Sequence, residues 1–144
     1  MKQNIPITHE FVELIPKKME ELTIYVSIEF TTASHKCFCG CGMEVVTPIS
    51  PADWQLIFDG ETITLHPSVG NWGFKCQSHY IIRRNTVVWA GPMSKEEIAR
   101  VRLNDHTLRS LYYKSDKEMP NEAISTPPPL KKRGFWETLK FWRQ

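Results

Sequence analysis

The stretch that decides the fold lies between Cys37 and Tyr80. It opens with Cys-Phe-Cys-Gly-Cys-Gly at 37–42, continues through Pro-Ser-Val-Gly-Asn-Trp at 67–72, and closes with Cys-Gln-Ser-His-Tyr at 76–80. All four cysteines of the chain lie inside this stretch. Because a thiolate site needs its ligand-bearing loops close together, the segments between the loops must fold the chain back on itself. The stretch predicts a β-rich domain built around one bound ion.

The cysteines favour a closed zinc site. Zinc held by thiolates takes four ligands at about 2.3 Å in a tetrahedron, so neighbouring sulfurs lie roughly 3.8 Å apart. Gly40 and Gly42 permit the left-handed turns that wrap a backbone round a metal. The predicted ligands of this structural Zn²⁺ are Cys37, Cys39, Cys41 and Cys76. His79 is a fifth candidate, because it follows Cys76 by three residues; its use would leave one of Cys37, Cys39 and Cys41 spare or open the site to water. Four free buried thiols or an iron–sulfur cluster would also account for the cysteines, but the spacing matches no common ferredoxin pattern.

Composition and charge limit the class of protein. The 144 residues are 41% hydrophobic and 24% charged, which is typical of one soluble globular domain with a tail. No run of 18 apolar residues and no secretory signal is present, so we expect a cytoplasmic protein in a reducing compartment. Of the net charge of +2, residues 131–144 carry +4 (five Lys/Arg, one Glu), which leaves −2 for the rest. A nucleic-acid partner is therefore not favoured.

The hydrophobic pattern predicts strands followed by one helix. Residues 10–15 form a first strand, and the alternation over 22–30 predicts a second with one buried face. Asp59-Gly60 predicts a hairpin with a type I′ turn, and Arg83-Arg84-Asn85 joins a second hairpin. Ser94 with Glu97 is a capping box, which predicts a helix to about Tyr112 or Tyr113. The helix's expected buried stripe contains Ile98, Val101, Leu108 and Leu111, although Asn104-Asp105 interrupts the pattern.

The predicted fold class is α+β, mostly antiparallel β with a zinc-bound pair of loops and one helix after the sheet. Residues 1–113 form this domain, 114–130 a flexible proline-rich linker, and 131–144 a basic, aromatic, amphipathic tail. The tail suits docking on a protein partner, on the body itself, or on an anionic membrane surface.

Two loops of the stretch also carry groups that suit hydrolysis. Serine is a weak nucleophile until a base within about 3 Å accepts its proton, and Ser68 with His79 is the pair that the loops bring together. A backbone N–H near Gly70 or the Asn71 amide is positioned to stabilise an oxyanion. Ser78 is a weaker candidate, since adjacent side chains of an extended segment point apart. The group that orients the imidazole stays open among Asp59, Glu61 and Glu44.

A purely structural role would account for the same residues. Ser68 after a proline is also typical of a turn cap, and a histidine beside a cysteine site often only hydrogen-bonds a sulfur. No nucleophile elbow, zinc-protease helix or phosphate-binding loop is present in the sequence.

The combined motifs resemble a family of small bacterial proteins with a domain of unknown function. The resemblance rests on residues 37–42, 67–72 and 76–80, followed by Val88-Trp89, and covers about residues 22–91. The family is similar to one encoded beside bacterial ubiquitin-like proteins and E1-type activating enzymes. The resemblance implies a role in a ubiquitin-like modification pathway, where a peptidase matures the modifier or removes it from targets.

Three hypotheses follow from the motifs and the resemblance. The first is a zinc-stabilised, deubiquitinase-like serine peptidase with Ser68, His79 and Asn71 at its site and a ubiquitin-like modifier or its conjugates as substrate. The second is a non-catalytic zinc adaptor that recruits targets or E1/E2-type enzymes. The third is a metallohydrolase in which His79 binds the zinc.

Overall fold

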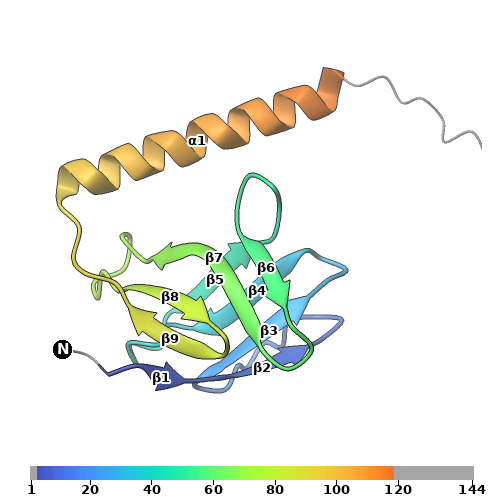
Figure 1. Ribbon diagram of the computed structural model, residues 1–144, viewed down its shortest axis with the longest axis vertical. Coiled ribbons are helices and arrows are strands. Elements are labelled where there is room, and N and C mark those ends of the chain that lie inside the picture. The colour runs from blue at the N-terminus through green and yellow to red at the C-terminus, as the bar shows by residue number, and fades with distance from the viewer. Residues whose placement is uncertain (1–2, 119–144) are drawn as a thin grey trace, which may run out of the picture.

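The computed structural model describes residues 3–118, which form two β-sheets and one helix (Figure 1). The first sheet has the strand order β1 (Ile5–Pro6), β9 (Thr86–Trp89), β8 (His79–Arg83), β7 (Ile63–Gly70) and β6 (Gln55–Phe58). The second has the order β2 (Thr8–Phe11), β3 (Thr23–Ser27), β4 (Thr32–Lys36) and β5 (Glu44–Pro48). Neighbouring strands are antiparallel except β2 and β3. With helix α1 (Lys95–Glu118) after the sheets, the predicted fold class is confirmed.

One hydrophobic core lies between the two sheets. Ile24 and Val26 of β3 contribute from one side, and Leu65 of β7 and Ile82 of β8 contribute from the other; all four are fully buried. Because these side chains are apolar and excluded from water, their burial is the main force that holds the sheets together. Cys37 belongs to the same core, so one side of the cysteine cluster packs against the buried interior.

Strand β3 differs from its predicted pattern, because both of its faces are buried. The segment before it covers the outer face: the Glu20 N–H donates to the Tyr25 hydroxyl, and the Ser27 hydroxyl donates to the Glu13 carbonyl. These polar residues are tolerated inside because each finds a hydrogen-bond partner. The strand also ends at Ser27, and Ile28 beyond it is exposed.

The two predicted hairpins form, but the type I′ turn lies in the second and not in the first. The connection from β6 to β7 is four residues long, with only Gly60 at positive φ, so the predicted type I′ turn is wrong there. The Asp59 carboxylate closes this loop by accepting from two N–H groups and the hydroxyl of Thr62. The turn between β8 and β9 instead has positive φ at both Arg84 and Asn85, as a type I′ turn requires.

Helix α1 begins with the predicted capping box. The Glu97 N–H donates to the Ser94 hydroxyl, and the Ser94 N–H donates to the Glu97 carboxylate, which lowers the pKa of Glu97. The helix continues to Glu118, past the predicted end and into the predicted linker. The rest of the linker and the tail lie outside the described residues. Among the helices of residues 3–118, none has the length and hydropathy needed to span a bilayer.

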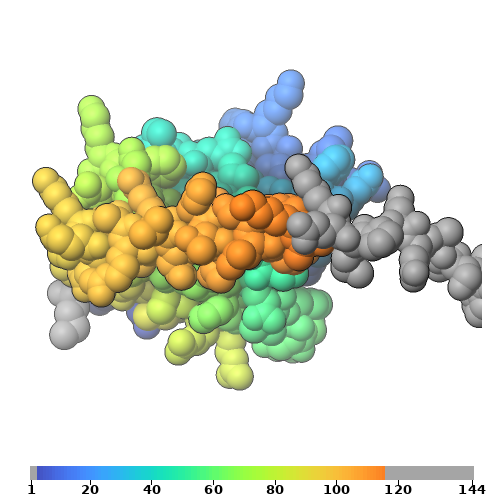
Figure 2. Space-filling view, turned by 90° about the horizontal axis from the view of Figure 1, so that it is seen from above, coloured from blue at the N-terminus to red at the C-terminus, as the bar shows by residue number. Residues whose placement is uncertain are grey.

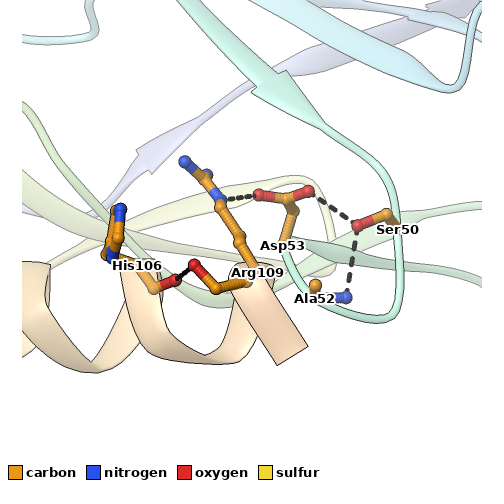
Figure 3. Close-up of polar contacts among 6 residues, drawn as sticks. Ser50, Ala52, Asp53, His106 and Arg109 are labelled. Carbon is orange, nitrogen blue, oxygen red and sulfur yellow. Dashed lines mark hydrogen bonds and ion pairs between the residues drawn. The ribbon is translucent and has the colours of Figure 1, made fainter. Parts of the chain in front are cut away.

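The predicted buried stripe of α1 is wrong. Val101, Leu108 and Leu111 are exposed, and only Ile98 is half-buried. The helix is held over the body at a distance instead, where Arg109 forms an ion pair with Asp53 of the β5–β6 loop (Figure 3).

Candidate functional site

The site follows from the way β7 pairs with β8. Gly70 lies directly opposite His79 across the two strands. Side chains alternate between the faces of a strand, so residues two positions from Gly70 share its face. Ser68 and Trp72 therefore flank His79 on one face of the strand pair. Diagonal neighbours of this kind are within reach of a histidine ring.

Ser68 and His79 are hydrogen-bonded to each other. Their Oγ and Nε2 atoms lie 2.9 Å apart, and the other ring nitrogen, Nδ1, lies 3.1 Å from the carbonyl oxygen of Gly91. A carbonyl only accepts, so Nδ1 must carry the ring proton of the neutral imidazole. Nε2 then carries the lone pair and accepts from the Ser68 hydroxyl. This is the tautomer that a general base for serine needs.

Trp72 packs against this pair. Its ring centroid lies 4.9 Å from that of His79, with the planes tilted by 57°. The indole also lies over Gly70, where a Cβ would come within 2.4 Å of its Nε1 atom. Glycine is therefore the residue that lets the tryptophan approach the strand, and the tryptophan limits the movement of the imidazole.

The opposite face of the same strands is buried. Asn71, Ser78 and Tyr80 all point into the interior, with at most 8% of each residue exposed. The Asn71 amide nitrogen lies 2.8 Å from the Ser78 hydroxyl and 3.2 Å from the Tyr80 hydroxyl. It lies 3.6 Å from the sulfur of Cys37. The Asn71 side chain, expected beside the reacting serine, thus lies on the other side of the strand from Ser68 and His79.

A histidine that the sequence did not single out completes this buried network. His35 Nε2 lies 2.9 Å from the Tyr80 hydroxyl, and its ring stacks on Phe38 at 4.4 Å. Burial lowers the pKa of His35 to about 3 and raises that of Tyr80 well above its usual value, so both are neutral near pH 7. Because Ser78, His79 and Tyr80 are consecutive residues of an extended segment, the sequence could predict that their side chains alternate between two faces. No sequence pattern predicts that Tyr80 contacts His35.

The four cysteine sulfurs form one cluster, with every sulfur within 4.8 Å of the others. Cys37 Sγ lies 3.3 Å from that of Cys39 and 3.9 Å from that of Cys76, and Cys41 lies 3.8 Å from Cys76. These spacings are close to the roughly 3.8 Å expected around a tetrahedral zinc ion. Gly40 and Gly42 have positive φ, as the predicted wrapping requires. The group can hold a metal ion.

The surroundings of the sulfurs shift the pKa values of two of the thiols in opposite directions. The Ser78 hydroxyl lies 3.0 Å from the Cys37 sulfur and 3.5 Å from that of Cys76. Burial would raise the pKa of Cys76, but hydrogen bonds from Ser78 and the neighbouring thiols outweigh it and lower the pKa to about 6. Burial and the hydrogen bond with Cys37 raise the pKa of Cys39 to about 12. A bound cation would favour the thiolate form that metal ligation by cysteine requires.

His79 is not part of this cluster, because both of its ring nitrogens bond elsewhere. The orienting acids offered by the sequence do not reach it either. Asp59 is bound within its own loop, Glu44 and Glu61 are exposed, and the Gly91 carbonyl occupies the position behind the ring. A backbone acceptor of this kind has no signature in a sequence.

A family model described as "Bacterial ubiquitination-like system serine protease (BubE)" matches residues 11–90, more than half of the chain. The chain belongs to this family. The match contains the whole Cys37–Tyr80 stretch and fits the bacterial ubiquitin-like pathway that the motifs implied. The BubE description names a serine protease as the class of protein and does not name the residues that act. No curated protein and no solved structure matches the chain.

Proposed function

We propose that this BubE-family chain is a zinc-stabilised serine peptidase that cleaves the bond after the C-terminal tail of a bacterial ubiquitin-like modifier. It would mature the modifier or release it from conjugates. The observation that carries the proposal is the hydrogen bond of 2.9 Å between Ser68 Oγ and His79 Nε2, with the Gly91 carbonyl fixing the tautomer. The family description gives the reaction class and the pathway.

The chemistry is acyl transfer through the serine. Ser68 Oγ attacks the scissile carbonyl, and its proton passes to His79 Nε2 as the O–C bond forms. The imidazolium then gives that proton to the leaving nitrogen as the C–N bond breaks. A water molecule, deprotonated by the same Nε2, attacks the acyl-enzyme, and the returned proton restores the serine. The Gly91 carbonyl keeps the ring oriented and accepts from Nδ1 throughout.

The oxyanion donor in this proposal is the backbone N–H of Gly70. The Asn71 N–H donates to the Ser78 carbonyl at 2.9 Å, so it points toward β8. N–H groups of consecutive residues in an antiparallel pair point to opposite sides, which turns the Gly70 N–H away from β8. It then faces the edge of β7 opposite to β8, two residues along the strand from Ser68. Asn71 itself has a positioning role in this proposal, through the buried network behind the strand.

The metal in this proposal is structural. Four thiolates around Zn²⁺ form a closed site, with no position left for substrate or water. Bound there, the ion ties the loop of Cys37 to the loop of Cys76. The latter lies three residues before His79, so the ion would fix the base relative to the serine without taking part in the reaction.

The test uses the ubiquitin-like modifier encoded beside proteins of this family, fused through its C-terminus to a reporter protein. Wild-type protein is expected to cleave the fusion, and Ser68→Ala and His79→Ala are each expected to lower the rate about 10³-fold or more without loss of fold. A fluorophosphonate probe should label the wild type at Ser68 and leave Ser68→Ala unlabelled.

The remaining outcomes separate the adaptor from the metallohydrolase. Binding of pathway proteins without any cleavage or labelling would support the zinc adaptor. Cleavage that survives Ser68→Ala but is lost on mild chelation of a still-folded protein would support a metallohydrolase.

A further inference from the structure

Two hollows lie on either side of the Ser68–His79 pair. A groove of about 590 Å³ is lined by the β5–β6 loop, the start of β6 and the His66-Pro67 segment. Pro67 is bonded directly to Ser68, so one wall of this groove is the residue next to the proposed nucleophile. A second hollow, of about 230 Å³, lies between Trp72 and the first two turns of helix α1, including Ile98. Trp72 contacts His79, so this hollow borders the pair from the opposite side.

Helix α1 borders the smaller hollow and is tied to the loop that borders the groove. Its first turns line the smaller hollow, and Arg109, further along the helix, holds Asp53 of the loop that borders the groove (Figure 3). Seen from above, the helix runs across the face of the body above these elements (Figure 2). Helix α1 therefore runs along the side of the body that carries both hollows.

The edge of β7 at residues 67–70 that faces away from β8 has no strand partner. Strand β6 leaves β7 after the pair Gln55 and His66. The backbone of Trp54 turns instead to its own loop, where its N–H donates to the Pro48 carbonyl and its carbonyl accepts from the Ser50 N–H. Among residues 3–118, no strand therefore continues β6 alongside residues 67–70. An open strand edge of this kind is where an extended peptide adds to a sheet.

One of the residues that line the groove has an unpaired donor. Trp54 lines it, and the buried Nε1 of Trp54 has no hydrogen-bond partner among the described residues. A buried N–H without an acceptor is costly, and peptide carbonyls are suitable acceptors. Among the described residues that line the groove, Asp53 is the only acidic or basic side chain apart from His66, and its carboxylate is already bound by Arg109 and the Ser50 hydroxyl. The groove therefore suits an uncharged, extended peptide.

We infer that the substrate is recognised as an extended, uncharged peptide tail, which lies in the Trp54–Pro67 groove. The inference rests on the proposed function, since it takes Ser68 as the nucleophile. An extended, uncharged segment of this kind is what the C-terminal tail of the modifier in the proposed function would supply.

The test fills the groove without touching the proposed catalytic pair. Gln55→Trp places a large ring on an exposed groove residue, and Ile57→Trp is the matched control on the same strand, exposed but outside the groove. The probes are a peptide with the last eight residues of the modifier and a C-terminal fluorogenic amide, and the small fluorophosphonate. We expect Gln55→Trp to raise KM for the peptide about tenfold or more, with the rate of fluorophosphonate labelling unchanged. Ile57→Trp should change neither.

The outcomes distinguish this inference from the proposed function. If the wild type is not labelled by fluorophosphonate and cleaves nothing, the proposed function fails. If the wild type is labelled but Gln55→Trp cleaves the peptide with unchanged KM, the groove is not the tail site and the inference is overturned. Trp54→Phe gives a second measurement, because it removes the indole N–H and keeps a ring: lower kcat/KM on the peptide with unchanged labelling supports a bond to the tail, and unchanged kcat/KM contradicts it.

Discussion

The two faces of the β7–β8 strand pair differ in burial and in the partners of their side chains. One face carries Ser68 and His79, half-buried and bonded to each other at the surface. The other carries Asn71, Ser78 and Tyr80, buried and connected to the cysteine cluster. Residues adjacent in sequence thus belong to different environments, because side chains alternate along a strand.

Under the proposed function, this difference explains how a small domain keeps a reactive pair rigid. The exposed face must then stay open to substrate, which limits the contacts that can hold it. The buried face supplies the missing rigidity through hydrogen bonds and, with an ion bound, through the thiolates. Substitutions on the buried face should therefore change stability, and substitutions on the exposed face should change the reaction.

The largest effect is expected when the metal is removed. Structural zinc contributes on the order of 10 kcal/mol to small domains, so Cys37→Ser or prolonged chelation should abolish cooperative folding and with it all activity. Metal analysis beside a thermal melt of the untreated and chelated protein checks this. Reloading with Zn²⁺ is the control and should restore the melt; a chelated protein that keeps its full melting temperature would contradict a structural ion.

The next largest effect separates two serines ten residues apart. Ser68→Ala should lower cleavage about 10³-fold or more and leave the free energy of unfolding within about 0.5 kcal/mol of the wild type. Ser78→Ala removes the hydroxyl beside Cys37 and Asn71, and should cost about 1–3 kcal/mol of stability while cleavage by the folded fraction persists. Urea unfolding and cleavage rates measured on both variants check the pair. The reverse pattern would exchange the roles of the two faces.

Asn71 tests the buried face alone. Asn71→Ala leaves the Ser78 and Tyr80 hydroxyls without the amide, which should lower the free energy of unfolding by about 1–3 kcal/mol. Asn104→Ala on the exposed side of α1 is the control and should stay within about 0.5 kcal/mol. If Asn71→Ala instead kept full stability and lost cleavage, its amide would act in the reaction, as the sequence alone suggested.

The sequence predicted the cysteine set and the meeting of Ser68 with His79 because both follow from spacing between turns. It also marked the capping box of α1, a local interaction within one turn. It did not predict that α1 would stand off the body, because its apolar residues have the spacing of a buried stripe and nothing local shows what covers them. The sequence also did not predict the bond of the Gly91 carbonyl to His79 or the bond between His35 and Tyr80. Both bonds join residues that are distant in sequence and carry no motif.

The smallest effect is expected at Gly70 on the exposed face, where the absence of a side chain leaves room for Trp72. Gly70→Ala places a Cβ against the Trp72 indole, which must move and release the ring of His79. Overpacking of this kind costs about 1–3 kcal/mol where neighbours cannot yield, and the exposed side of Trp72 should keep the loss near the lower end. We expect kcat for the peptide to fall about tenfold with KM little changed, because orientation of the base matters only as the bond reacts.

The double variant Gly70→Ala, Trp72→Ala removes the clash and also the support of the imidazole. If Trp72 positions His79, this double variant regains stability but not kcat; full recovery of kcat would show that the indole only fills space.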